Sequence, residues 1–168
     1  MNFFKIFFII FFSLFYINNN VYALELKPVI NLDVAKQMAD TCEAMRAEEN
    51  WNPINIAIVD SGADLVLFRR QDGAFLGSID IAIRKATSSA MIPRSTRKVG
   101  ELAYAEDGTL GPRPGVATVD FLVPFAGGLP IRTETGHLIG AIGISGASSD
   151  QDEECAQAAI DSVKHLLN

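Results

Sequence analysis

Three basic side chains on adjoining predicted elements could together bind an anion. Arg69 and Arg70 end an apolar run, and Lys85 lies further along the chain. The Asp72-Gly73 turn joins the two elements, so we expect Arg69 and Lys85 to converge on one site. Arginine suits carboxylates in particular, because its forked donors match two carboxylate oxygens. An ion pair from Arg69 to Asp72, which would fix the turn, explains that arginine without any ligand.

Glycines at two further places could close the other side of such a site. Gly115 lies in a segment rich in glycine and proline, and Gly127-Gly128 interrupts a strand-like run. Glycine lets a ligand come close to backbone N–H groups. The same glycines would equally serve to shape the loop alone, so both interpretations stay open.

Other site chemistries lack the residue patterns that they need. Ser145 is followed directly by Gly146, so the Gly-x-Ser-x-Gly elbow of a serine nucleophile is absent. Neither glycine-rich phosphate-binding motif occurs. The acidic run Asp150–Glu154 opens a predicted helix, where capping and the helix dipole explain it first, although weak surface binding of iron stays open. We therefore expect neither a nucleotide enzyme nor a dedicated metal site.

The spacing of apolar residues predicts four helices and one long loop around these candidates. Asn31 and Ser78 are the predicted caps of two helices, and Ser149 with Asp152 resembles a capping box. The glycine- and proline-rich segment Glu106–Val116 is predicted to be a loop long enough to be functional. The predicted helices are Asn31–Glu49, Ser78–Ile92, Ser95–Tyr104 and Ser149–Leu167.

Five short apolar runs predict β-strands. They are Ile54–Asp60, Leu65–Arg70, Thr118–Leu122, Phe125–Thr133 and Leu138–Ser145. The first two form a hairpin, and short links make the other three an antiparallel meander. Because Ile54–Val59 and Leu138–Ile144 are apolar at nearly every position, helices should cover both faces of the sheet. We predict an α/β (α+β) fold with one central five-stranded antiparallel sheet between helical layers.

Small residues in the last predicted strand favour close packing of a helix on the sheet. Gly140, Ala141 and Gly143 lie within this apolar run, and Gly146 follows it. Glycine inside a strand marks a bulge or a close approach of another backbone or of a ligand. Packing is the favoured explanation of the two.

The first 23 residues predict a secretory signal peptide. Lys5 supplies the basic start, Ile6–Ile17 the apolar core and Val21–Ala23 the small residues of a cleavage site. The apolar core is shorter than the about 20 residues that an anchor helix needs. We expect cleavage after residue 23, export to the periplasm or the medium, and a single domain over residues 24–168.

Charge and cysteine content limit the partners. The net charge is −6, and no stretch after the signal gathers enough Lys or Arg to neutralise a row of phosphates. Nucleic acid and membrane surfaces are therefore not expected as partners. The even cysteine count, Cys42 and Cys155, invites a disulfide in an exported chain, while two buried thiols explain it equally well. The choice depends on whether the first and last helices are neighbours.

Six short motifs occur in order along nearly the whole mature chain. They are IAIVDSG at Ile56–Gly62, FRRQDGAFLGS at Phe68–Ser78, Lys85-Ala86, Pro114-Gly115, GGLP at Gly127–Pro130, and GAIGISGA at Gly140–Ala147 with the following Gln151–Glu153. Their order and spacing resemble the GlcG/HbpS-like family, which is similar to the C-terminal domain of PduO-type corrinoid adenosyltransferases. The resemblance implies a profilin-like α-β-α fold, homo-oligomers and, in secreted members, binding or breakdown of haem.

The haem that this resemblance implies needs iron ligands, cations for its propionates and an apolar slot. The candidate ligands are His137, at the turn before the last strand, and His165, near the end of the last helix. A solvated turn and a helix dipole explain them without iron. Cys-x-x-Cys-His is absent, which excludes c-type attachment. The candidate cofactor-binding residues are Arg69, Asp72, Gly73, Lys85, Gly115, Gly127, Gly128, His137 and His165.

Three functions follow, and the favoured one is a secreted protein that binds haem for sequestration, sensing or breakdown. The second is a binding protein or enzyme for a small carboxylate, using Arg69 and Lys85, because the resembled module occurs beside glycolate and diol metabolism. The third is an oligomeric scaffold in which the glycines serve packing alone. The family fold would also place the first and last helices side by side, bringing Cys42 and Cys155 within the Cα separation of about 7 Å that a disulfide tolerates.

Overall fold

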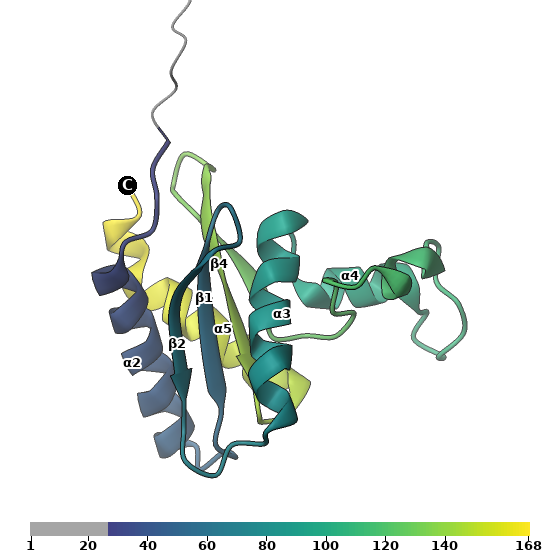
Figure 1. Ribbon diagram of the computed structural model, residues 1–168, viewed down its shortest axis with the longest axis horizontal. Helices are drawn as coiled ribbons and strands as arrows, with labels where there is room; N and C mark the ends of the chain where they lie inside the picture. Colours follow the sequence, from purple (N-terminus) through teal and green to yellow (C-terminus); the bar gives the residue numbers. More distant parts are fainter. Residues whose placement is uncertain (1–26) are drawn as a thin grey trace, which may run out of the picture.

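A computed structural model describes residues 27–168 of the chain (Figure 1). The predicted signal peptide, residues 1–23, lies outside the described residues. The helices are α2 (Leu32–Glu48), α3 (Gly77–Met91), α4 (Thr96–Ala103) and α5 (Ser149–Val163), with short 3₁₀ helices η1 (Pro114–Thr118) and η2 (Lys164–Leu166). The strands are β1 (Asn55–Asp60), β2 (Leu65–Arg70), β3 (Gly128–Arg132) and β4 (Leu138–Ser145). Within residues 27–168, no helix combines the length and apolar character needed to cross a membrane.

The four strands form one antiparallel sheet in the order β2-β1-β4-β3. β1 and β4 lie at its centre and are buried almost throughout. Helices α2 and α5 pack side by side on one face, and α3 packs on the other (Figure 1). The prediction that helices cover both faces of the sheet is therefore confirmed.

Larger and smaller side chains alternate along β1, and this alternation separates the two faces of the sheet. Ile56 and Ile58 of β1 point into the core under α2 and α5, whereas Ala57 and Val59 pack under α3. The α3 face is consequently built from small side chains, and the helix comes close to the sheet. A Cβ atom on Gly143 would lie 2.2 Å from the backbone oxygen of Ala82 in α3. Close helix packing thus explains this strand glycine, as the sequence favoured.

The prediction of a fifth strand at Thr118–Leu122 is wrong. Thr118 ends η1, and its hydroxyl donates to the carbonyl of Gly115. The residues that follow run along α3 and use its polar side chains in place of a neighbouring strand. The Ser88 hydroxyl donates to the Phe121 carbonyl and accepts the N–H of Val123, each at 2.8 Å. Because these backbone groups are already satisfied, the segment has no need of a strand partner.

Helix starts differ from the predicted caps at two places. Asn31 caps α2 as predicted, and its side chain accepts the N–H of Val34 at 2.9 Å. Ser78 lies inside α3, which begins at Gly77, and its hydroxyl donates to the Phe75 carbonyl at 2.7 Å instead of capping the helix. The capping box of α5 uses Ser148 with Gln151, one residue before the predicted pair.

A disulfide joins the two helices of the first layer. Cys42 of α2 and Cys155 of α5 are bonded, with their Cα atoms 5.1 Å apart, and both residues are fully buried. The separation lies inside the range that a disulfide tolerates. The bridge closes a loop with a sequence separation of 113 residues.

Candidate functional site

The predicted anion site does not form, because Arg69 and Lys85 lie on opposite faces of the sheet. Arg69 is opposite Ile56 in the β1–β2 ladder, so its side chain shares the face that α2 covers. There its guanidinium contacts Asp40 at 2.5 Å and Glu43 at 2.8 Å. The hydrogen bond to Asp40 is the largest cause that raises the pKa of Arg69. The expected ion pair with Asp72 is replaced by these two contacts with α2.

The turn between β2 and α3 accounts for two further candidates. Asp72 is exposed, and Gly73 has a positive φ of 80° where the Ala74 N–H returns to the Gln71 carbonyl. The glycine is needed for this backbone conformation, whether or not a ligand binds. Gly115 likewise lies exposed in η1, on another part of the molecule.

Lys85 of α3 is fully buried, so its charge is not open to an anion at the surface as the predicted site requires. Its ammonium group donates to a carboxylate oxygen of Asp152 and to the Ile144 carbonyl, each at 2.8 Å. The ring of Phe125 covers it at 5.0 Å from the ring centroid. The other Asp152 oxygen accepts the Ala147 N–H at 3.1 Å. We call Lys85, Asp152 and Phe125 the buried lysine corner.

Burial shifts the pKa values of the two charged groups in this corner. Desolvation is the largest cause at both groups, lowering the pKa of Lys85 and raising that of Asp152. Their mutual attraction opposes both shifts. The two pKa values therefore move toward each other, and each group depends on the other to remain charged.

The two adjacent glycines are the wall of this corner. A Cβ on Gly127 would lie 2.5 Å from the Lys85 ammonium nitrogen, and one on Gly128 would lie 2.5 Å from the Lys85 carbonyl oxygen. Gly127 also has a φ of 119°, which side chains disfavour. Gly127 and Gly128 thus contact Lys85 directly, but through packing that leaves no room for a ligand between them.

Asp152 is the site residue that the sequence did not assign. The sequence explains it first as part of a helix cap, since an acidic residue suits the start of a helix, and otherwise only as part of a weak surface site for iron. The available signal was Lys85 itself, which lies three residues after Ala82 and next to Ala86 in the buried stripe of α3. A lysine in such a stripe needs a buried acidic partner.

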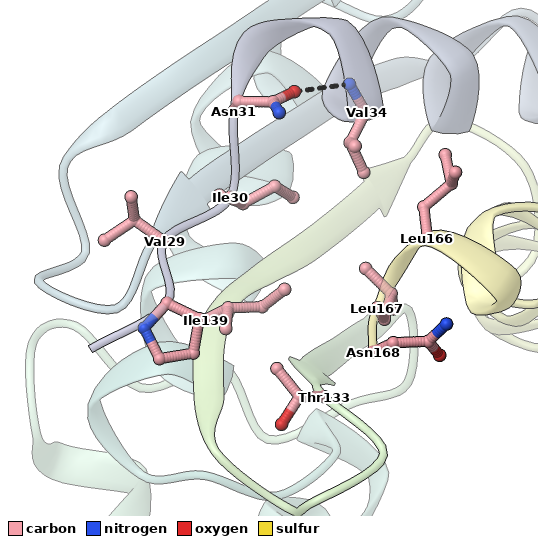
Figure 2. Close-up of a pocket in the computed structure, with 10 residues that line it drawn as sticks. Val29, Ile30, Asn31, Val34, Thr133, Ile139, Leu166, Leu167 and Asn168 are labelled. Carbon is pink, nitrogen blue, oxygen red and sulfur yellow. Dashed lines mark hydrogen bonds between the residues drawn. The ribbon is translucent and has the colours of Figure 1, made fainter. Parts of the chain in front are cut away.

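A small pocket of mixed polar and apolar lining lies at the opposite end of the sheet from the α3 start (Figure 2). Its walls come from the segment before α2, the end of the β3–β4 hairpin and the C-terminal residues. The lining residues are Pro28, Val29, Ile30, Asn31, Val34, Thr133, Ile139, Leu166, Leu167 and Asn168. A volume of about 90 Å³ gives room for a small chemical group only. Larger ligands usually occupy about 300 to 1,000 Å³, so only one edge of such a ligand would enter.

Backbone hydrogen bonds hold the walls of this pocket together. The Glu134 N–H donates to the Leu167 carbonyl at 2.9 Å, which fastens the hairpin to the C-terminal end. The Thr133 N–H donates to the His137 carbonyl at 3.0 Å and closes the hairpin turn. The pocket is therefore framed by segments far apart in the sequence.

Both histidines lie at this end of the molecule, although neither lines the pocket. His137 is exposed in the hairpin turn, where its backbone N–H donates to the Thr133 hydroxyl at 3.1 Å. His165 is exposed in η2, directly before the lining residue Leu166. Lys164 and Arg132 supply exposed cations nearby, because both line an adjoining hollow that also contains Thr133 and Leu167. Imidazole, cationic and apolar groups thus gather around one end of the sheet.

Clustered metal ligands are absent from residues 27–168, where no three His, Cys, Asp or Glu side chains could hold a metal ion together. An arginine of α4 forms ion pairs with acidic residues at the start of α5. Arg97 contacts Asp150 at 2.6 Å and Glu153 at 2.5 Å.

Comparison with known proteins identifies the family. Residues 30–161 match the family model described as haem degrading protein HbpS-like. The chain belongs to the HbpS-like family. An uncharacterized 15.0 kDa protein from the dhaT-dhaS intergenic region of Citrobacter freundii is 33% identical to this HbpS-like chain over 137 residues, covering 82% of this chain and 94% of that protein.

Two solved structures share the HbpS-like fold. Protein ORFY of Klebsiella pneumoniae superposes with a TM-score of 0.75 at 30% identity, covering 84% of this chain and 94% of that one. The crystal structure of a PduOC:heme complex superposes with a TM-score of 0.71 at 24% identity, covering 80% of this chain and 95% of that one. The resemblance stated from the sequence motifs is therefore confirmed.

Proposed function

We propose that this chain binds haem. The observation that carries the proposal is the match of residues 30–161 to a family described as haem degrading. The PduOC structure, a complex with haem, adds support because it has the same fold. The proposal concerns binding, and no residue is assigned a catalytic role.

The pocket of Figure 2 is the place that suits haem best. Haem needs an apolar surface for the macrocycle and imidazole or a similar ligand for iron. Val29 and Leu166 at the rim of the pocket provide an apolar surface, with 69% and 49% of their area exposed. One edge of the macrocycle would enter the pocket while the rest lies on this surface. His137 and His165 are the proposed iron ligands, and Arg132 and Lys164 the proposed partners of the propionates.

The carboxylate function loses its structural basis. It required Arg69 and Lys85 to act together, but the sheet separates them and each is already bound to acidic side chains. An anionic substrate would have to displace a carboxylate from a buried ammonium group at Lys85. We therefore do not propose this function.

Export completes the proposal. Residues 1–23 have a basic residue near the start and an apolar run after it, which supports removal of a signal peptide and transfer to the periplasm or the medium. The Cys42–Cys155 bridge agrees with this, because disulfides persist in oxidising compartments.

A haem titration of residues 24–168 tests the proposed site. We expect the Soret band to saturate at one haem per chain, and His137→Ala or His165→Ala to weaken binding and shift the band. Asp72→Ala, at an exposed turn away from the pocket, is the matched control and should behave like the wild type. Weak binding without saturation would refute haem binding, and a band unchanged in both histidine variants would refute this location.

A further inference from the structure

The amine of Lys85 has one side that only an aromatic ring covers. Asp152 and the Ile144 carbonyl accept two of the three N–H groups of its ammonium form, and the described residues supply no third hydrogen-bond acceptor. Gly127 comes so close to the nitrogen that it has no room for a Cβ. The Phe125 ring lies over the amine, with its centroid 5.0 Å from the nitrogen.

Phe125 can uncover this amine without a change in the fold. The residue lies between η1 and β3, outside any helix or strand, and 41% of its area is exposed. Exposed side chains change rotamer within picoseconds to nanoseconds. Rotation of the ring into solvent would leave an opening of the size of a benzene ring beside the nitrogen.

The Lys85–Asp152 pair has the chemistry of an amine nucleophile with its base. An amine attacks a carbonyl carbon only in its neutral form, and the Asp152 carboxylate, 2.8 Å away, is placed to take its proton. Burial lowers the pKa of Lys85 and raises that of Asp152, so this proton transfer is less costly than it is in water. Lysines in apolar surroundings are activated as nucleophiles in this way.

We propose that Lys85 is a covalent binding site for a small neutral aldehyde, with Phe125 as its lid and Asp152 as its proton acceptor. The nitrogen attacks the carbonyl carbon, and the electron pair of the C=O double bond moves to the oxygen. Asp152 passes two protons of the ammonium group to that oxygen, which leaves as water. An aldehyde and the ammonium group thus give one iminium ion and one water.

The product suits the corner because it keeps the buried charge. The iminium nitrogen is still positive and retains one N–H, so Asp152 does not lose its cationic partner. None of Lys85, Asp152 and Phe125 lines the pocket of Figure 2. The covalent site therefore does not depend on haem binding.

The charges around the amine favour a neutral aldehyde over an acidic carbonyl compound. Among the described residues, the charged groups that act on Lys85 are both acidic, Asp152 and Glu153. Arg97, the cation beside Glu153, is already paired with it and with Asp150. A carboxylate on the substrate would be repelled here. An apolar body would instead take the place of the Phe125 ring.

Reductive trapping of the folded chain, residues 24–168, tests the covalent site. Benzaldehyde is the probe, because it matches the ring that it replaces, and cyanoborohydride reduces the iminium to a stable amine. Peptide mapping by mass spectrometry then measures the rate at each lysine near neutral pH. Lys98, with 64% of its side chain exposed, is the internal control. We expect Lys85 to react at least about tenfold faster, since each unit of lowered pKa raises the neutral fraction tenfold.

A pair of matched variants tests the lid. Phe125→Ala should make Lys85 react faster, whereas Phe75→Ala, at an aromatic residue that is 63% exposed in the turn before α3, should react like the wild type. Circular dichroism establishes that both variants are folded. A Phe125→Ala variant that reacts no faster than Phe75→Ala would overturn the assignment of the lid.

A matched acidic probe tests the class of substrate. 4-Carboxybenzaldehyde has the same ring as benzaldehyde with an added carboxylate, and it should react more slowly at Lys85 than benzaldehyde does. An equal or faster reaction of the acidic probe would overturn the preference for a neutral aldehyde. A Lys85 that reacts no faster than Lys98 with benzaldehyde would overturn the covalent site itself, and haem binding would be unaffected by that result.

Discussion

The ammonium group of Lys85 lies 2.8 Å from a carboxylate oxygen of Asp152, and only 1% and 3% of these side chains are exposed. The pair connects α3 to the first turn of α5 across the end of β4. Burying two charges is costly, and their attraction offsets this cost only when further hydrogen bonds satisfy both groups. Here the Ile144 carbonyl and the Ala147 N–H supply those bonds. The corner is therefore stable only as a complete set.

Removing one charge of the pair should destabilise the fold strongly. We expect Asp152→Asn or Lys85→Met to lower the free energy of unfolding by about 3–5 kcal/mol, because each leaves a buried charge without its partner. The double variant Lys85→Met with Asp152→Leu should lose less than either single variant, since no charge is left buried. Urea denaturation measures all three.

The matched control for this prediction is an exposed lysine. Lys98 pairs with Glu101 at 3.1 Å, but 64% of its side chain is exposed. Lys98→Met should therefore change the free energy of unfolding by no more than about 0.5 kcal/mol. Similar losses in Lys85→Met and Lys98→Met would contradict the importance given to the buried pair.

The pH dependence of the Asp152→Asn variant should reveal the buried ammonium group. Burial lowers the pKa of Lys85 below its usual 10.5, and the charge of Asp152 opposes that shift. Loss of this charge lowers the pKa further. A group with a depressed pKa stabilises the fold above its unfolded pKa and loses this contribution as the pH falls through its folded pKa. The variant should therefore gain stability relative to the wild type as the pH rises from neutral toward 10.5.

Urea midpoints measured across this pH range check the sign. Between the folded and the unfolded pKa of Lys85, the free energy of unfolding of the variant should rise by up to about 1.4 kcal/mol per pH unit. Asp161→Asn, an exposed acidic position in the same helix, is the control and should run parallel to the wild type. Parallel curves for Asp152→Asn and the wild type would show that Lys85 keeps its pKa without Asp152.

The sequence predicted the layers of the fold because their signals are local. Continuous apolar runs marked β1 and β4 as strands buried on both faces, and Asn31 marked the start of α2. The Thr118–Leu122 error has a non-local cause. Its apolar residues resemble a strand, but Ser88 of α3 takes up its backbone groups. Nothing within the segment itself carries that information.

The candidate site was harder to predict than the fold. The identities of Arg69 and Lys85 indicated charge, but the face of the sheet on which each lies depends on register and on which helix covers it. Arg69 lies on the α2 face because it pairs with Ile56 in the β1–β2 ladder. Lys85 lies on the other face because it belongs to the buried stripe of α3. The pocket of Figure 2 combines residues 28–34 with residues between 133 and 168, so no short motif encodes it.

Substitutions at two glycines should distinguish a glycine that close packing requires from one that only makes the backbone more flexible. Gly143→Ala should cost about 1–3 kcal/mol or more, because its Cβ would lie 2.2 Å from the Ala82 carbonyl oxygen, and α3 would have to move. Gly77→Ala has no atom within 4 Å of the new Cβ and should stabilise α3 by about 0.4–1 kcal/mol. Thermal unfolding of both variants measures the difference. A Gly143→Ala variant as stable as the wild type would mean that α3 is not packed this closely.

The Cys42–Cys155 bridge should contribute about 2–5 kcal/mol, because it closes a long loop in the unfolded chain. Reductant should therefore lower the urea midpoint of the wild type. The double variant Cys42→Ala with Cys155→Ala is the control, since reductant cannot change it. Both cysteines are fully buried, so this variant also loses packing and should be no more stable than the reduced wild type. Equal midpoints for the oxidised and reduced wild type would contradict the bridge, and the support that it lends to export would go with it.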